Sequence, residues 1–319
     1  MNSRQSFVAM AITGIALAAG ASTARAALTH RYSFVGDTGD SVGGANGTLR
    51  NIATVSGGQL QFNNPTFSPA SFAGGYLSLP ASIMPAAGSV TIEEWGTYLG
   101  SGFFTENYTF TNHNNDFVNP PSNPPGANVG QYLMNAISAP QPASPPGGAN
   151  TGGNHVAQAV SGFAGSLTPP PGPETDAFGT TPGIGAGGGG GYLDDGGTYM
   201  TATVIDGGAG TLSYYLFRVS DGVGGLQQTI PAIPLSSYSF TNAYLGRSAF
   251  LGDNWLSGSI DEFRIYNNAR GIASVTADFK AGPNSLVPEP ASLFLAAAGA
   301  LGLIACRRSL KTAIDLRRF

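Results

Sequence analysis

This 319-residue sequence contains a single cysteine, Cys306, which lies close to the C-terminus. The body of the chain therefore has no disulfide to stabilise it and must rely on a large core or on a metal. Histidine is also scarce, and His30, His113 and His155 are far apart in the sequence. No H-x-E or H-E-x-x-H spacing occurs, so the sequence does not predict a zinc site.

Positively charged residues are also scarce. Residues 27–286 contain seven Arg and Lys residues against sixteen Asp and Glu residues, a net charge near −9. An acidic body with so little lysine argues against binding to nucleic acid or to an anionic membrane surface. It is compatible with divalent cations. Its length of about 260 residues fits one β-rich domain with insertions.

The N-terminus has the composition of a targeting segment. Met1–Ala26 contains Arg4, an apolar run over Phe7–Ala19 and the small-residue sequence Ala24-Arg25-Ala26. This order is typical of a secretory signal peptide, cleaved after Ala26. The alternative is a membrane anchor, for which the apolar run is short.

The C-terminus has three elements in a fixed order: a V-P-E-P sequence, a short apolar run at 293–305 and an arginine pair. The residues concerned are Val287, Pro288, Glu289, Pro290, Arg307 and Arg308. Together they resemble the PEP-CTERM sorting signal of Gram-negative bacteria. The resemblance implies export through the inner membrane and a short transmembrane helix within 288–310 that holds the protein before processing. It also implies a basic cytoplasmic tail at 311–319 and cleavage by an exosortase-type peptidase. A plain C-terminal anchor is the alternative.

Between the two ends, short segments with a period of two predict strands. Residues 28–34, 89–99, 103–110 and 257–266 alternate bulky and polar side chains, with glycine- or asparagine-rich turns between such segments. Residues 199–217 predict a β-hairpin around a glycine turn. The only helix expected outside the ends covers 269–279. Eleven to thirteen short strands predict a two-sheet antiparallel sandwich.

The stretch G-S-I-D-E-F-R-I-Y-N, which begins at Gly258, resembles the closing strand of laminin-G-like, concanavalin A-like jelly-roll domains. The segments H-R-Y-S-F at His30 and G-S-V-T-I-E-E-W at Gly88 are similar to the opening strand and a central strand of that family. The resemblance implies an all-β jelly roll whose first and last strands are neighbours. It also makes 103–110 the hairpin partner of 89–99.

The domain is expected to cover 27–281, followed by a linker at 282–287. Within it, residues 112–191 are rich in proline and glycine and read as an insertion of long loops. Two islands in this insertion, 131–137 and 155–160, predict strands. A flexible surface insertion is the alternative.

Catalytic patterns are missing from the sequence. Glycosidic cleavage needs two carboxylates about 5–9 Å apart, and the adjacent acids Glu93-Glu94 and Asp261-Glu262 should point to opposite faces of their strands. No E-x-D-x-x-E motif, phosphate-binding loop or nucleophile elbow is present. We expect no enzyme. The alternative is a glycoside hydrolase or lyase whose carboxylates the fold brings together.

The resemblance further implies a structural Ca²⁺ between the first and last strands, with Asp37 or Asp40 and Asp261 as ligands. Each aspartate alone also fits an ordinary turn. For saccharide stacking, Tyr98, Tyr108, Tyr214 and Trp255 are candidates, and core packing is the alternative for each.

The sequence thus predicts an exported, non-enzymatic protein of the cell surface, outer membrane or extracellular matrix. Its expected partners are an exosortase-type peptidase and a polysaccharide or another matrix component.

Overall fold

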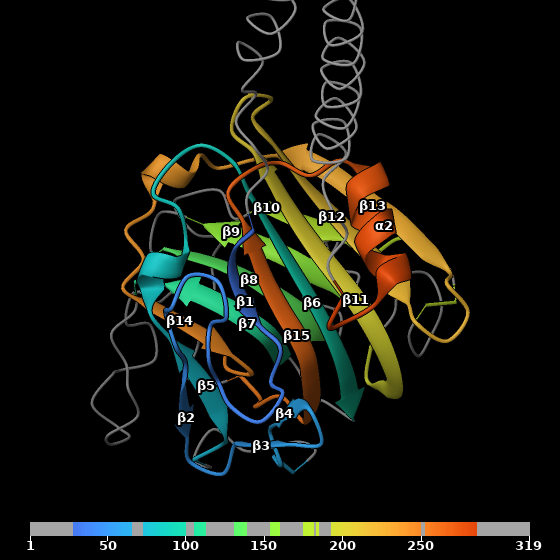
Figure 1. Cartoon of the computed structure of the whole chain (residues 1–319). Helices are drawn as coiled ribbons and strands as arrows, with labels where there is room; N and C mark the ends of the chain where they lie inside the picture. Colours follow the sequence, from blue (N-terminus) through green and yellow to red (C-terminus); the bar gives the residue numbers. More distant parts are fainter. Residues whose placement is uncertain are drawn as a thin grey trace, which may run out of the picture. The chain divides into compact units, whose positions relative to one another are not determined.

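The computed structural model describes residues 28–65, 73–99, 105–112, 131–138, 154–159, 175–181, 183–184, 193–249 and 253–285. They belong to a compact unit that spans Ala27–Val287. Within these ranges the chain forms two antiparallel sheets and one α-helix, α2 (Ile272–Ala281) (Figure 1). The predicted all-β sandwich is confirmed, while the helices expected at the two ends lie outside the described residues.

The eight-stranded sheet, called sheet A here, has the order β13-β12-β11-β6-β15-β4-β3, with β1 beside β15. Its strands are β1 (Leu28–Tyr32), β3 (Thr54–Ser56), β4 (Gln59–Gln61), β6 (Val90–Leu99), β11 (Asp195–Asp206), β12 (Thr211–Arg218), β13 (Gly224–Pro231) and β15 (Gly258–Tyr266).

The seven-stranded sheet, called sheet B, has the order β10-β9-β8-β7-β14-β5-β2. Its strands are β2 (Thr48–Arg50), β5 (Tyr76–Leu79), β7 (Thr105–Thr111), β8 (Tyr132–Ser138), β9 (His155–Ala159), β10 (Thr175–Phe178) and β14 (Asn242–Leu245). Two single-turn 3-10 helices, at Ala81–Ile83 and Leu235–Ser237, complete the described secondary structure.

Strand β15 is the centre of sheet A. It pairs with β6 along one edge, and with β4 and β1 along the other. The first and last strands are therefore neighbours, as the family resemblance implied. A bulge between Ile260 and Glu262 allows Ile260 and Phe263, three residues apart, both to point into the core.

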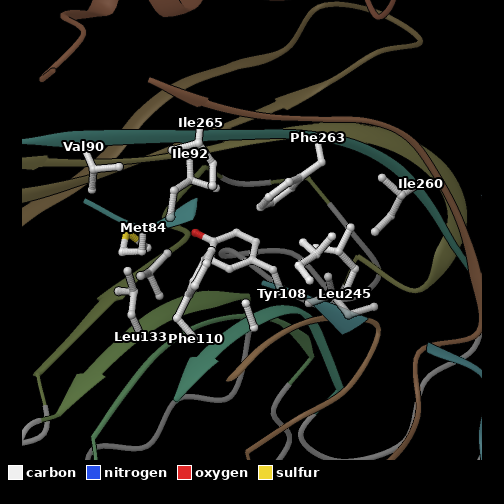
Figure 2. Packing of buried hydrophobic residues seen from close by; sticks show 14 of the residues in the cluster. Met84, Val90, Ile92, Tyr108, Phe110, Leu133, Leu245, Ile260, Phe263 and Ile265 are labelled. Carbon is white, nitrogen blue, oxygen red and sulfur yellow. The ribbon is translucent and has the colours of Figure 1, made fainter. Parts of the chain in front are cut away.

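The core lies between the two sheets (Figure 2). Val90, Ile92, Phe263 and Ile265 of sheet A face Leu133 and other apolar residues of sheet B. Burial of these side chains is the main stabilising contribution in a domain without disulfides.

The outer face of sheet A is covered by α2. Val275 and Phe279 of the helix pack on an apolar cluster that includes Trp95 and Phe217, and the rings of Phe217 and Phe279 stack at 4.6 Å. The helix begins three residues later than the sequence predicts, at Ile272 rather than Ala269.

Two expectations need correction. β6 and β7 are not a hairpin, because β6 pairs with β11 and β15 in sheet A, whereas β7 pairs with β8 and β14 in sheet B. The second correction concerns the proline- and glycine-rich insertion. Its two islands form the predicted strands, β8 and β9, but these are internal strands of sheet B and not parts of an insertion of long loops. A third strand in the insertion, β10, was not predicted, and neither was β13.

Candidate functional site

The outer face of sheet B carries three aromatic rings around one arginine. The neighbours of Tyr76 on β5 and of Tyr244 on β14 lie in the core, so strand alternation places these two rings on the outer face. Trp255 stacks on Tyr76 at 5.7 Å between ring centroids, and Tyr244 meets Tyr76 edge-on at 5.5 Å. The guanidinium carbon of Arg247 lies 4.5 Å from the centroid of Tyr244 and 4.9 Å from that of Tyr76. We call these four residues the aromatic–arginine cluster.

A glycine turn brings Arg247 to this position. Gly246 has φ = 78°, a conformation that strains any residue with a side chain. A Cβ atom there would also lie 2.3 Å from the ring of Phe62. The Gly246 N–H donates to the carbonyl of Asn107 on the adjacent β7, and the chain then leaves β14 across the outer face.

A pair of carboxyl groups lies beside the cluster. Glu106, at the start of β7, hydrogen-bonds with Asp253, and the Ser248 hydroxyl donates to Asp253. Arg247-Ser248 and Asp253 to Trp255 belong to the same loop, so the cluster and this acid pair (Glu106 and Asp253) form one continuous region. Burial raises the pKa of Asp253 to about 7 and raises that of Glu106 well above its usual value. Both shifts favour the protonated form of the carboxyl groups in this pair.

The spacing of the acid pair limits its chemistry. Retaining glycosidases hold their carboxyl groups about 5–5.5 Å apart, and inverting enzymes hold them farther apart. Glu106 and Asp253 are in hydrogen-bond contact, which leaves no room for a glycosidic bond or a water molecule between them. This arrangement resembles a proton-sharing pair more than a pair that attacks a sugar from two sides.

The aromatic residues that the sequence singled out are buried. Tyr98, Tyr108 and Tyr214 lie in the core between the sheets, where their exposure is at most 1%. Alternation along a strand is the same for a ring that faces the other sheet and a ring that faces solvent, so the sequence did not separate the two. Trp255 belongs to the aromatic–arginine cluster. The prediction of an exposed stacking surface on the three tyrosines is corrected accordingly.

The core tyrosines instead satisfy buried polar groups. Tyr98 donates to Glu94 over 2.9 Å, and Tyr108 donates to Thr203 over 2.6 Å. Burial raises the pKa of Glu94 to about 8, so this carboxyl group is largely protonated inside the sandwich at neutral pH.

The adjacent Glu93 points the other way, as alternation predicts. It lies under α2 with Arg264 and Arg270, at 3.9 Å and 3.6 Å respectively. Arg270 also pairs with Asp278 of the helix, and Arg264 Nε lies 2.6 Å from Glu262. We call these five residues the ionic network. It ties the helix, β6 and β15 together with opposite charges in contact.

The three aspartates predicted to bind calcium have separate roles. Asp40 accepts hydrogen bonds from the His30 ring and from four backbone N–H groups of its own loop and of β1. Burial alone would raise the pKa of Asp40, but these bonds lower it to about 2. Asp37 caps an exposed turn through the Gly39 N–H, and Asp261 accepts from Gln59 on β4.

Across the ranges that the structure describes, no group of three or more His, Cys, Asp or Glu side chains is placed to hold a metal ion. The calcium prediction therefore stays a prediction.

The six residues of the sorting signal lie outside the described ranges. No α-helix in the described part of the chain is long and apolar enough to span a membrane. At the sequence level, residues 286–309 match the PEP-CTERM protein-sorting motif. The match indicates an exported protein that an exosortase-type peptidase of a Gram-negative bacterium recognises.

Comparison of the fold with solved structures finds sandwich domains at low sequence identity. Domain 4 of AbnA, a GH43 extracellular arabinanase from Geobacillus stearothermophilus, in complex with arabinotriose, is 19% identical with a TM-score of 0.47, over 79% of this chain and 98% of that one. The binding domain of botulinum neurotoxin DC, in complex with rat synaptotagmin II, is 11% identical with a TM-score of 0.44, over 79% and 51%.

The CBM40 domain of the Ruminococcus gnavus IT-sialidase, bound to α2,3-sialyllactose, is 15% identical with a TM-score of 0.36, over 60% and 82%. No curated protein matches the sequence significantly.

Sequence reasoning missed most of the outer face of sheet B. Asp253 looks like a turn residue in the sequence, and Glu106 is far from it along the chain. One sequence feature could have pointed to Arg247: it is one of only seven basic residues in 27–286 and follows directly on a glycine that ends a strand.

Proposed function

We propose that this chain is an exported, non-enzymatic protein of the cell surface or extracellular matrix. Its sandwich domain binds polysaccharide or forms part of the exopolymer, and its C-terminal motif directs sorting by an exosortase-type peptidase. The observation that carries this proposal is the PEP-CTERM motif match at residues 286–309, immediately after a folded domain that ends with α2.

The outer face of sheet B is the region we assign to saccharide binding. Aromatic rings offer flat apolar faces to sugars, and a guanidinium offers several hydrogen-bond donors to hydroxyl groups. The four side chains of the aromatic–arginine cluster are 4–7% exposed, so a saccharide would reach their rings only when the residues that cover them move aside. The net charge of the body, near −9, repels polyanions, which favours a neutral polysaccharide.

The acid pair is the one observation that favours the enzymatic alternative. However, the hydrogen-bond contact brings Glu106 and Asp253 closer together than the two carboxylates that usually cleave a glycosidic bond. Incubation of the protein with polysaccharides, followed by a reducing-sugar assay, tests this. Hydrolysis that is lost in Glu106→Gln would favour the enzyme.

The sorting role is tested in a Gram-negative host that has an exosortase. The full chain is compared with a variant in which Pro288, Glu289 and Pro290 are replaced by alanine, and the cell fractions and intact mass are measured. We expect the wild type to lose its C-terminal segment and leave the inner membrane, and the variant to stay there unprocessed. The control replaces Thr312, Ile314 and Asp315, beyond the motif, by alanine. If the motif variant and wild type show the same mass and fraction, the sorting role is wrong.

A further inference from the structure

Two side chains of β15, Glu262 and Arg264, bind the backbone at the point where the chain leaves the sandwich. After α2, Gly282 ends the helix with φ = 79°, and its N–H donates to the carbonyls of Asp278 and Phe279. The backbone N–H of Asn284 then donates to the Glu262 carboxylate, and Arg264 Nη2 donates to the Ser285 carbonyl over 2.6 Å. The residues expected to be a linker are therefore attached to the domain at least as far as Ser285.

These two side chains are themselves firmly held. Glu262 and Arg264 are fully buried and paired at 2.6 Å, and Glu262 also accepts from Arg31 of β1 over 2.6 Å. The Arg264 guanidinium lies 4.4 Å from the ring centroid of Trp95. Burial would raise the pKa of Glu262, but hydrogen bonds from Arg264 and Arg31 keep it below its usual value, so the charge that holds Asn284 persists.

The attachment leaves a very short tether. The sorting motif match begins at residue 286, directly after Ser285. From Ser285 to Pro288 there are three peptide units, which span at most about 11 Å when fully extended. A membrane peptidase that recognises this motif would meet it within that distance of the folded sandwich.

We propose that Glu262 and Arg264 form an exit clamp, and that an exosortase-type peptidase gains access to the sorting motif only when residues 284–285 are released from it. The clamp thereby links processing to local opening at the end of the domain. This inference rests on the sorting role proposed above. It adds a function to β15, whose Glu262 and Arg264 would otherwise serve only the ionic network.

Two variants test the clamp without altering its buried charges. Asn284→Pro removes the backbone donor to Glu262 and is incompatible with the φ of 64° at this position. The second variant inserts eight Gly and Ser residues between Ser285 and Leu286. This leaves the clamp closed but lengthens the tether by roughly 16 Å on average. The same insertion after Leu310, beyond the motif, is the control.

Processing is followed by pulse–chase of the full chain in the exosortase-containing host. We expect Asn284→Pro to raise the rate about tenfold, the factor that corresponds to one lost hydrogen bond of about 1.4 kcal/mol. The spacer should raise the rate too, and the control insertion should not. Wild-type processing that neither variant accelerates would overturn the clamp and leave the sorting role intact. If neither the wild type nor the spacer variant is processed, the sorting role fails, and the clamp proposal with it.

Discussion

The two outer faces of the sandwich both bury charged side chains, but they neutralise them differently. On sheet A, the ionic network places Arg264 and Arg270 against Glu93, Glu262 and Asp278. On sheet B, Arg247 lies against aromatic rings, and Glu106 lies against another acid. Buried charges need partners of opposite sign to be stable.

The difference marks the outer face of sheet B as the candidate functional region. The outer face of sheet A follows the rule of opposite charges, and these ion pairs hold α2 and the end of the domain. Sheet B departs from that rule at the acid pair, which must share a proton instead. Buried pairs of like-charged groups occur more often at functional sites than elsewhere. On this ground we propose the outer face of sheet B as the saccharide-binding region.

The largest effect should come from Arg264→Met. It removes the cation that Glu262 and Glu93 share, while Arg31 and Arg270 stay beside them, so we expect a cost of about 3 kcal/mol, the low end of the range for breaking a buried pair. Urea unfolding measures the change in the free energy of unfolding. Arg218→Met, which breaks an exposed ion pair with Asp221, is the matched control and should cost below about 1 kcal/mol. Equal losses in the two variants would show that burial of the ionic network is unimportant.

The pH dependence of stability should come chiefly from the buried acids whose pKa values burial raises. The pKa of Asp253 is raised to about 7, so the folded state retains a proton that the unfolded state releases near its ordinary value of 3.8. The contribution of this proton to the free energy of unfolding is complete below pH 3.8 and is lost as pH rises through about 7. The loss is on the order of a few kcal/mol. Glu94 adds a loss of the same sign, between 4.5 and about 8.

Thermal unfolding between pH 4 and 8 checks this. Asp253→Asn should reduce the fall in melting temperature with rising pH below pH 7. Glu94→Gln should reduce the part of the fall that extends to pH 8. A wild-type melting temperature that rises from pH 5 to pH 8 would contradict the assigned directions.

A smaller loss is expected from Arg247→Met on sheet B. The methionine keeps much of the apolar packing but loses the cation–π contacts, worth about 1–2 kcal/mol. Urea unfolding beside Arg264→Met measures the contrast between the two faces directly. A loss as large as that of Arg264→Met would show that the aromatic–arginine cluster is as structural as the ionic network.

Calcium should have the smallest effect. To bind it, Asp40 would have to exchange five hydrogen bonds that already occupy its carboxylate. We expect a change in melting temperature below about 1 °C on adding millimolar CaCl₂. A rise of several degrees that Asp261→Asn abolishes would instead support the site at Asp37, Asp40 and Asp261.

Local pattern was sufficient for the parts of the fold where one face is apolar. Alternation placed β15 and the hairpin of β11 and β12, and it predicted that Glu93 and Glu94 diverge. It failed where the chain changes sheets, as between β6 and β7, because period two does not specify the partner strand. It also missed β13, whose ends carry glycine and proline.

The candidate site was harder to predict because it is assembled from distant residues. Glu106 and Asp253 become neighbours through the pairing of β7 with β14 and through the bridge between Thr105 and Asn254. Tyr76 and Tyr244 lie in the short strands β5 and β14, and which face they occupy depends on the second sheet. Burial of Tyr98, Tyr108 and Tyr214 follows from that same packing.

The assignment of saccharide binding to sheet B is tested most directly on a glycan array. The array carries neutral and acidic polysaccharides, and wild type is compared with Arg247→Met and with Tyr214→Phe, a core control that loses only a hydroxyl group. Wild type and Tyr214→Phe should bind the same neutral glycans, and Arg247→Met should lose them while remaining folded. Unchanged binding by folded Arg247→Met, or binding by none of the three proteins, would contradict this assignment.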